Sequence, residues 1–121
     1  MSRKLLIFAA LNGAVAVAAG AFAAHGAGPA VKTLLTTGAH YQLAHAVLAT
    51  ACAIWAGGGS TARLAGWLAA SGGLVFGLAL YGVGALGFTA MGMVAPVGGV
   101  LMIAGWIVLA LAAARRPGDL T

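Results

Sequence analysis

Residues 5–24 read LLIFAALNGAVAVAAGAFAA, and the only polar side chain in this run is that of Asn12. A helix of this length extends about 30 Å at 1.5 Å per residue, which matches the hydrocarbon core of a bilayer. Arg3 and Lys4 precede the run, so a signal peptide is the alternative interpretation. Signal peptides, however, have apolar cores of roughly 7–15 residues. The stretch therefore predicts a membrane helix that the mature chain retains.

Three further apolar segments follow, at about residues 40–57, 62–86 and 95–114. Hydrophobic residues make up 63% of the chain and charged residues 6%, whereas soluble proteins carry about 25% charged residues. The sequence therefore predicts an all-α membrane protein, a bundle of four transmembrane helices that forms one domain over residues 1–121. The connection at residues 26–38 is predicted to be either a short helix lying in the membrane interface or a plain loop.

The basic residues lie at the ends of the apolar segments and not on one periodic face, which argues against nucleic-acid binding. With four spans, one side of the membrane holds five of the six basic residues, namely Arg3, Lys4, Arg63, Arg115 and Arg116. The opposite side holds only Lys32. The positive-inside rule then predicts that both termini lie in the cytoplasm, as in a multi-pass protein of a bacterial inner (plasma) membrane.

Small residues recur at helical spacing on the first and third apolar segments. Such stripes let helix backbones approach closely, so they predict either packing within one bundle or a dimer interface. Two stripes on one chain favour internal packing. Asn12 and Ser71 fall at similar depths, which predicts a hydrogen bond between them. The residues predicted to pack the helices together are Asn12, Gly13, Gly20, Ser71, Gly73, Gly77, Gly98, Gly99 and Gly105.

A polar cluster is predicted on the outer side, where the first segment ends and the second begins. Its candidate members are His25, Tyr41, Gln42, His45 and Tyr81. Tyr41 and His45 lie within about 40° of each other on a helix. Three interpretations remain open: hydrogen bonds that tie the helices together, metal or haem ligation by the two histidines, or binding of a small molecule or quinone. Two imidazoles underfill a closed zinc site, so the first interpretation is favoured.

Five motifs along the chain carry a family resemblance: Ala21-Phe22-Ala23-Ala24-His25-Gly26, Tyr41-Gln42-Leu43-Ala44-His45, Phe76 with Leu80-Tyr81, Pro96-Val97-Gly98-Gly99 and Gly105-Trp106. Together they resemble the YgdD-like family of small membrane proteins, a domain of unknown function (number 423) similar to transmembrane protein 256. The resemblance covers about residues 11–109. It implies four membrane spans and supplies no activity, cofactor or catalytic residue.

The absence of acidic residues and of deeply placed basic residues from the apolar segments narrows the range of functions that the sequence allows. The apolar segments contain no Asp or Glu and no deep Lys or Arg, although a coupled transporter is expected to hold an ionisable group near the midplane. Ser71 and His45 are predicted to lie in opposite leaflets, and the only acidic residue is Asp119, so no catalytic set can be assembled. The sequence therefore predicts no enzyme, no metal and no cofactor.

The function predicted from the sequence is structural or accessory, through helix–helix association with a second copy or with another membrane protein. The alternative is a protein that binds a small molecule or quinone, or an oligomeric transporter, with the histidines at its outer face. The predicted partners are the lipid bilayer and either a homo-oligomer or a membrane-protein partner.

Overall fold

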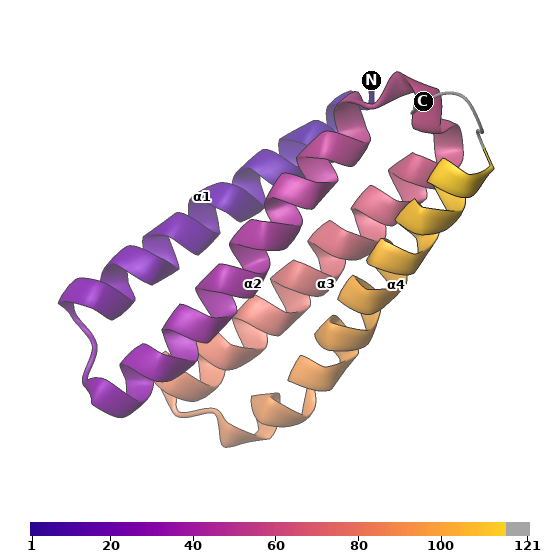
Figure 1. Cartoon of the computed structure of the whole chain (residues 1–121). Helices are drawn as coiled ribbons and strands as arrows, with labels where there is room; N and C mark the ends of the chain where they lie inside the picture. The colour runs from indigo at the N-terminus through magenta and orange to yellow at the C-terminus, as the bar shows by residue number, and fades with distance from the viewer. Residues whose placement is uncertain (116–121) are drawn as a thin grey trace.

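The computed structural model describes residues 1–115 as four long helices that run up and down beside one another (Figure 1). They are α1 (Arg3–His25), α2 (Pro29–Ile54), α3 (Gly59–Leu86) and α4 (Ala95–Ala114). Two short 3₁₀ turns, η1 (Ala56–Gly58) and η2 (Thr89–Met93), connect α2 to α3 and α3 to α4. The described residues contain no strand, so the predicted all-α class is confirmed. Predictions that involve Arg116 or Asp119 lie outside the described residues.

Three segments are long and apolar enough to cross a membrane, namely Arg3–His25, Ala56–Leu86 and Thr89–Ala114. α2 is not among them, since its polar side chains interrupt the apolar sequence. Its 26 residues nevertheless extend about 39 Å, and α2 packs along both α1 and α3. α2 is therefore part of the helical bundle.

The beginning of α2 corrects the predicted connection between the first two segments. Instead of a separate interfacial helix or a loop at residues 26–38, one helix continues without a break from Pro29 to Ile54. Pro29 lies in the first turn, where its missing N–H costs no hydrogen bond. Gly38 does not interrupt the helix, and it gives space to Tyr81 of α3. α2 thus begins eleven residues before His40, the predicted start of the second segment.

The helices form an open row and not a closed square. α2 packs between α1 and α3, α4 packs mainly on α3, and α1 also touches α3. Figure 1 shows α1 and α4 at the two edges of the row, with the start of α1 and the end of α4 at the same end. A groove remains between α2 and α4, with α3 at its base.

Glycines on one face of α3 bring α2 close. A Cβ atom added at Gly73 would lie 3.2 Å from the Cβ of His45, and one added at Gly77 would lie 3.1 Å from Oε1 of Gln42. Gly13 of α1 packs similarly, since its added Cβ would lie 3.9 Å from that of Ala46 on α2. These predicted packing positions are therefore used inside one chain.

A different face of α3 meets α4, and here the two backbones touch. A Cβ added at Gly72 would lie 2.8 Å from the carbonyl oxygen of Gly98, and one added at Gly98 would lie 2.8 Å from the Cα of Phe76. At Gly105 the added atom would lie 3.0 Å from the backbone nitrogen of Ala69. The missing side chains thus allow α4 to lie directly on α3.

Two of the predicted packing glycines differ from each other in their surroundings. Gly20 of α1 faces Ala39 of α2, with 3.7 Å from the added Cβ to the alanine Cβ. Gly99, in contrast, is a correction: a Cβ added there would meet nothing within 4 Å, because the position opens into the groove. The stripes therefore pack within the chain, as the favoured interpretation predicted.

Candidate functional site: a polar tie and a groove between α2 and α4

A chain of hydrogen bonds centred on Gln42 ties α1, α2 and α3 together. Its Nε2 donates to Oδ1 of Asn12 at 2.9 Å, and its Oε1 accepts from the Tyr81 hydroxyl at 2.7 Å. Asn12 Nδ2 donates in turn to the carbonyl oxygen of Phe8 at 3.0 Å. The predicted bond from Asn12 to Ser71 is therefore a correction. The Gln42 amide both donates and accepts, so it satisfies Asn12 and Tyr81 together.

Two glycines make the room that Tyr81 needs. A Cβ added at Gly38 would lie 2.8 Å from the tyrosine ring, and one added at Gly77 would lie 3.2 Å from its hydroxyl oxygen. Helical side chains point toward the N-terminus of their helix, so Tyr81 leans toward the middle of α3. Its hydroxyl thereby reaches Gln42, which is only 1% exposed.

His45 links α2 to α4 through Trp106. The indole Nε1–H donates to Nε2 of His45 at 3.1 Å, and Nδ1 of His45 lies 2.6 Å from the carbonyl oxygen of Tyr41. An indole nitrogen can only donate, so Nε2 must accept and the imidazole proton must lie on Nδ1. Both bonds are then satisfied by the neutral Nδ1–H tautomer. The His45 side chain is 6% exposed, so these two partners supply its polar contacts.

The structure brings together four of the five residues of the predicted cluster. Gln42 and Tyr81 share a hydrogen bond, and the rings of Tyr41 and His45 are nearly parallel, with centroids 6.4 Å apart. His25 is a correction, because it lies exposed at the end of α1 and none of the side-chain hydrogen bonds of residues 1–115 involves it. The cluster thus has no second histidine.

The register of the helices explains why His25 lies apart. Gly13 faces Ala46, so His45 is level with the middle of α1. His25 is about 17 Å farther along the axis, at 1.5 Å per residue. The prediction at the outer ends assumed that the second helix begins near His40, whereas α2 begins at Pro29.

The same register corrects the predicted depth of Ser71. Gly73 lies directly against His45, so Ser71 and His45 differ in depth by only about 3 Å. The prediction that they lie in opposite leaflets is wrong. Both ring nitrogens of His45 are nevertheless engaged by other partners, so this geometry does not form a serine–histidine pair.

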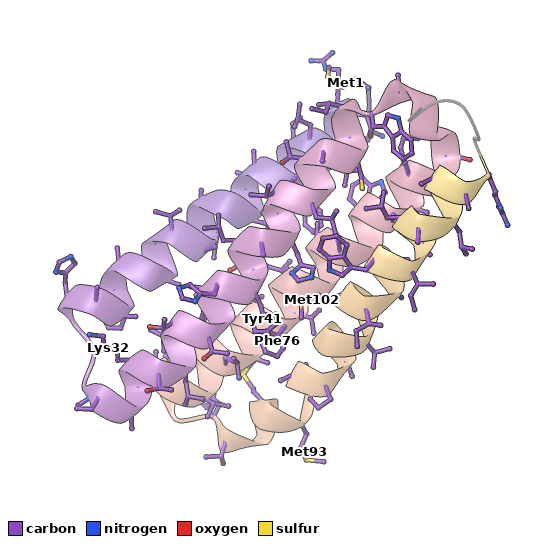
Figure 2. All side chains as sticks on the ribbon, in the orientation of Figure 1. Met1, Lys32, Tyr41, Phe76, Met93 and Met102 are labelled. Atoms are coloured by element: carbon purple, nitrogen blue, oxygen red, sulfur yellow. The ribbon has the colours of Figure 1, made fainter. Side chains whose placement is uncertain are left out.

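A groove between α2 and α4 lies beside this cluster and has two halves, which we call the Tyr41 half and the Trp55 half. The Tyr41 half has a volume of about 470 Å³, and the Trp55 half has a volume of about 410 Å³. Trp106 lines both halves, so its indole separates them. Residues of the Tyr41 half include Thr37, Tyr41, His45, Phe76, Gly99 and Ile103; those of the Trp55 half are Trp55, Leu109, Ala110 and Ala113. Figure 2 shows Tyr41, Phe76 and Met102 converging between α2 and α4.

Trp106 was missed as a site residue by reasoning from the sequence, where it appears only within a family motif. A signal was present, because tryptophan in membrane proteins is enriched at the two interfaces. Trp106 instead stands in the middle of the last apolar segment. A tryptophan at that depth needs a partner for its N–H, and His45 is that partner.

The chemistry of the groove is that of a neutral binding site. Its lining includes no Asp, Glu, Lys or Arg. Across residues 1–115, no three His, Cys, Asp or Glu side chains gather in a way that would hold a metal ion. Every buried side-chain nitrogen or oxygen in this part of the chain has a hydrogen-bond partner. The groove can therefore hold an uncharged, largely apolar molecule.

These features define a small all-helical integral membrane protein with an uncharged groove. The chain belongs to the DUF423 family, described as proteins of unknown function, which matches residues 19–99. This confirms the resemblance predicted from the motifs.

Several relatives are similar over nearly the whole chain. A UPF0382 membrane protein of Haemophilus influenzae is 38% identical over 120 residues, covering 91% of this chain and 93% of the relative. The UPF0382 inner membrane protein YgdD of Escherichia coli K12 is 33% identical over 126 residues, with 94% and 92% covered. YwdK of Bacillus subtilis is 32% identical, with 93% and 98% covered. No solved structure matches the chain significantly. The chain is thus a multi-pass protein of the inner membrane.

Proposed function

We propose that this is a four-span, non-enzymatic accessory protein of the inner membrane that holds a lipophilic molecule in the groove between α2 and α4. The groove itself carries this proposal. Small-molecule sites have volumes of roughly 300–1,000 Å³ and are lined by apolar and aromatic side chains with a few polar groups. The Tyr41 half has about 470 Å³ and this kind of lining. It opens between two helices of the bundle, so a ligand enters from the bilayer.

The glycine stripes shift the accessory role away from simple helix–helix association. They were the reason to expect a surface for another helix, and in the fold they are covered by neighbouring helices of the same chain. The groove is the surface that remains open. A helix of a second protein in the groove is the competing occupant, and the experiment below distinguishes the two.

The four-span topology is supported by the position of α2 and by the charges. α2 packs between α1 and α3, and its buried Gln42 and His45 are both bonded inside the bundle, so neither of these two polar side chains needs to face lipid. Figure 2 shows Met1 and Lys32 at opposite ends of the molecule. Arg3, Lys4, Arg63 and Arg115 belong to the end that carries Met1, which supports a cytoplasmic location of that end.

The topology is tested with reporters fused after Thr121. We expect a cytoplasm-dependent reporter to be active and a periplasm-dependent reporter to be inactive, because the basic residues retain that end in the cytoplasm. The same pair of reporters inserted after Gly28, between α1 and α2, should give the reverse result. Activity of the periplasmic reporter at Thr121 would overturn the proposed orientation.

The binding role is tested by what remains bound after purification from native membranes in mild detergent. Gly99→Leu places a side chain in the open groove at a position where an added Cβ meets no protein atom within 4 Å, and Val100→Leu enlarges a neighbouring exposed residue instead. We expect a stoichiometric small molecule, identified by mass spectrometry, in the wild type and Val100→Leu but not in Gly99→Leu. A protein displaced by Gly99→Leu would instead support helix–helix association, and a molecule retained equally by Gly99→Leu would contradict a site in the groove.

A further inference from the structure

We propose that the groove takes a neutral lipid with a flat, carbonyl-bearing ring and a long apolar tail, which is the chemistry of a prenylated quinone. This inference rests on the proposed function, because it names the ligand class of the same groove. The ring would lie in the Tyr41 half, and the tail would follow the Trp55 half.

The charge of the groove selects the class of lipid head. Phosphate-bearing heads are bound by Arg or Lys, and neither residue lines the groove. The one basic residue toward the same end of the bundle, Lys32, is exposed on the first turns of α2 and does not line it. A neutral head is therefore the complementary one, and an anionic phospholipid head is not.

The walls of the Tyr41 half are aromatic on two sides. The rings of Tyr41 and Phe76 have centroids 5.1 Å apart at 58°, and those of His45 and Trp106 have centroids 6.0 Å apart at 78°. The hydrogen bond to His45 holds the indole in its orientation across the groove. Flat rings gain binding free energy from offset or edge contacts with such walls in addition to the burial of their surface. An ordinary acyl chain gains only the free energy of burying its apolar surface.

Tyr41 supplies a hydrogen-bond donor that has no other use in the fold. None of the side-chain hydrogen bonds of residues 1–115 involves its hydroxyl, and the side chain is 50% exposed along the groove. The nearby Trp106 N–H is already donated to His45, so it is not free for a ligand. A ring carbonyl is an acceptor that would pair with the Tyr41 hydroxyl, and a hydrocarbon chain would leave that hydroxyl unpaired.

The Trp55 half suits the tail, because it is lined by tryptophan, leucine and alanine side chains. Ala110 and Ala113 stand on its α4 side, where larger residues would close it. From Gly99 to Ala113 the groove follows α4 for about 21 Å at 1.5 Å per residue. A tail of several isoprene units fits along this length, past the exposed edge of Trp106, whose side chain is 51% accessible.

The test uses tryptophan fluorescence in nanodiscs of phosphatidylcholine. One variant, Trp55→Phe with Trp67→Phe, keeps only Trp106 in the groove. A reference variant, Trp55→Phe with Trp106→Phe, keeps only Trp67, whose ring stacks on Phe8 at 5.3 Å and does not line the groove. Decylubiquinone, a quenching quinone, is titrated into both. We expect saturable quenching of Trp106 and only linear, collisional quenching of Trp67.

A matched competitor distinguishes recognition of the quinone ring from non-specific hydrophobic binding. Decylbenzene has the same tail on a ring without carbonyls, and we expect it to relieve the quenching of Trp106 only at concentrations at least tenfold above that of the quinone. Tyr41→Phe should weaken quinone binding about tenfold, since it removes one hydrogen bond, and should leave competition by decylbenzene unchanged. Gly99→Leu should abolish the saturable phase.

The outcomes separate the two proposals. Linear quenching of Trp106, unaffected by Gly99→Leu, would overturn the groove as a binding site and with it the proposed function. Saturable binding in which decylbenzene competes as well as the quinone, and to which Tyr41→Phe makes no difference, would leave the binding function standing and overturn the ring-lipid inference. Selective quinone binding that depends on Tyr41 supports both.

Discussion

The two interfaces of α3 use the same residue type for different purposes. Toward α2, glycines make space for polar side chains, and the hydrogen bond between Tyr81 and Gln42 crosses the interface. Toward α4, glycines bring backbone against backbone at Gly72 and Gly98, and none of the side-chain hydrogen bonds of residues 1–115 joins these two helices. The interface between α2 and α3 is therefore fixed by a directional hydrogen bond, and the interface between α3 and α4 is fixed by close packing of the two backbones.

This difference separates a fixed part of the molecule from an adjustable one. Hydrogen bonds constrain both the rotation and the register of a helix, so α1, α2 and α3 are tied as a unit through Gln42. Packing of small residues constrains mainly the distance between helices. α4 therefore depends on close contact with α3 and on one bond across the groove, from Trp106 to His45. We therefore expect that bond to set the width of the groove.

The largest expected effect comes from breaking the backbone contact of α4. Gly98→Leu would put its Cβ 2.8 Å from the Cα of Phe76, and backbone atoms cannot move aside as a flexible side chain can. Overpacking typically costs about 1–3 kcal/mol, and we expect this variant at or above the upper end. Thermal unfolding in detergent measures the loss. The neighbouring Gly99→Leu is the control, since a Cβ added there meets nothing within 4 Å, and equal loss in both variants would contradict the assigned faces.

A smaller effect is expected where hydrogen bonds of Gln42 join the helices. Gln42→Leu keeps the side-chain volume but leaves Oδ1 of Asn12 without its donor in a buried place. A buried unsatisfied polar group costs about 1–3 kcal/mol. The double variant with Asn12→Leu removes both partners, so it should be less destabilised than the sum of the single variants. Additive losses in unfolding titrations would show that the two amides do not interact.

The sequence predicted most of the fold because the fold follows from composition and spacing. Runs of apolar residues set the helices, and α4 spans residues 95–114 as predicted. The start of α2 was not predictable in the same way, because residues 29–39 are not apolar enough for a span and Gly38 is a residue type that often ends a helix. What extends the helix there is a tertiary contact, the Tyr81 ring against Gly38, and single-helix patterns do not contain it.

The candidate site was predictable only in part for a related reason. Tyr41 and His45 share a helix face, so helical geometry alone places them together. Gln42 and Asn12 are neighbours only through the register of α1 against α2, which depends on where α2 begins. The predicted depths of His25 and Ser71 relative to His45 were wrong because the predicted start of α2 was eleven residues too late. That error changes the predicted depth of every residue along α2. Trp106 required knowing which face of α4 turns toward the groove.

The smallest expected effect concerns the bond that joins α4 to α2. Trp106→Phe keeps an aromatic ring in the groove and removes the donor to Nε2 of His45. Hydrogen bonds between membrane helices average about 0.6 kcal/mol in double-mutant cycles, so the free energy of unfolding should fall only by about that amount. The distance between α2 and α4 is the more sensitive readout, because the bond is what spans the groove. Spin labels at Val47 and Ile107, both exposed, should give a broader distance distribution in Trp106→Phe than in the wild type. The same pair of labels in Gln42→Leu is the control, since that change acts on the other side of α2, and an unchanged distribution in Trp106→Phe would mean that packing on α3 alone sets the groove.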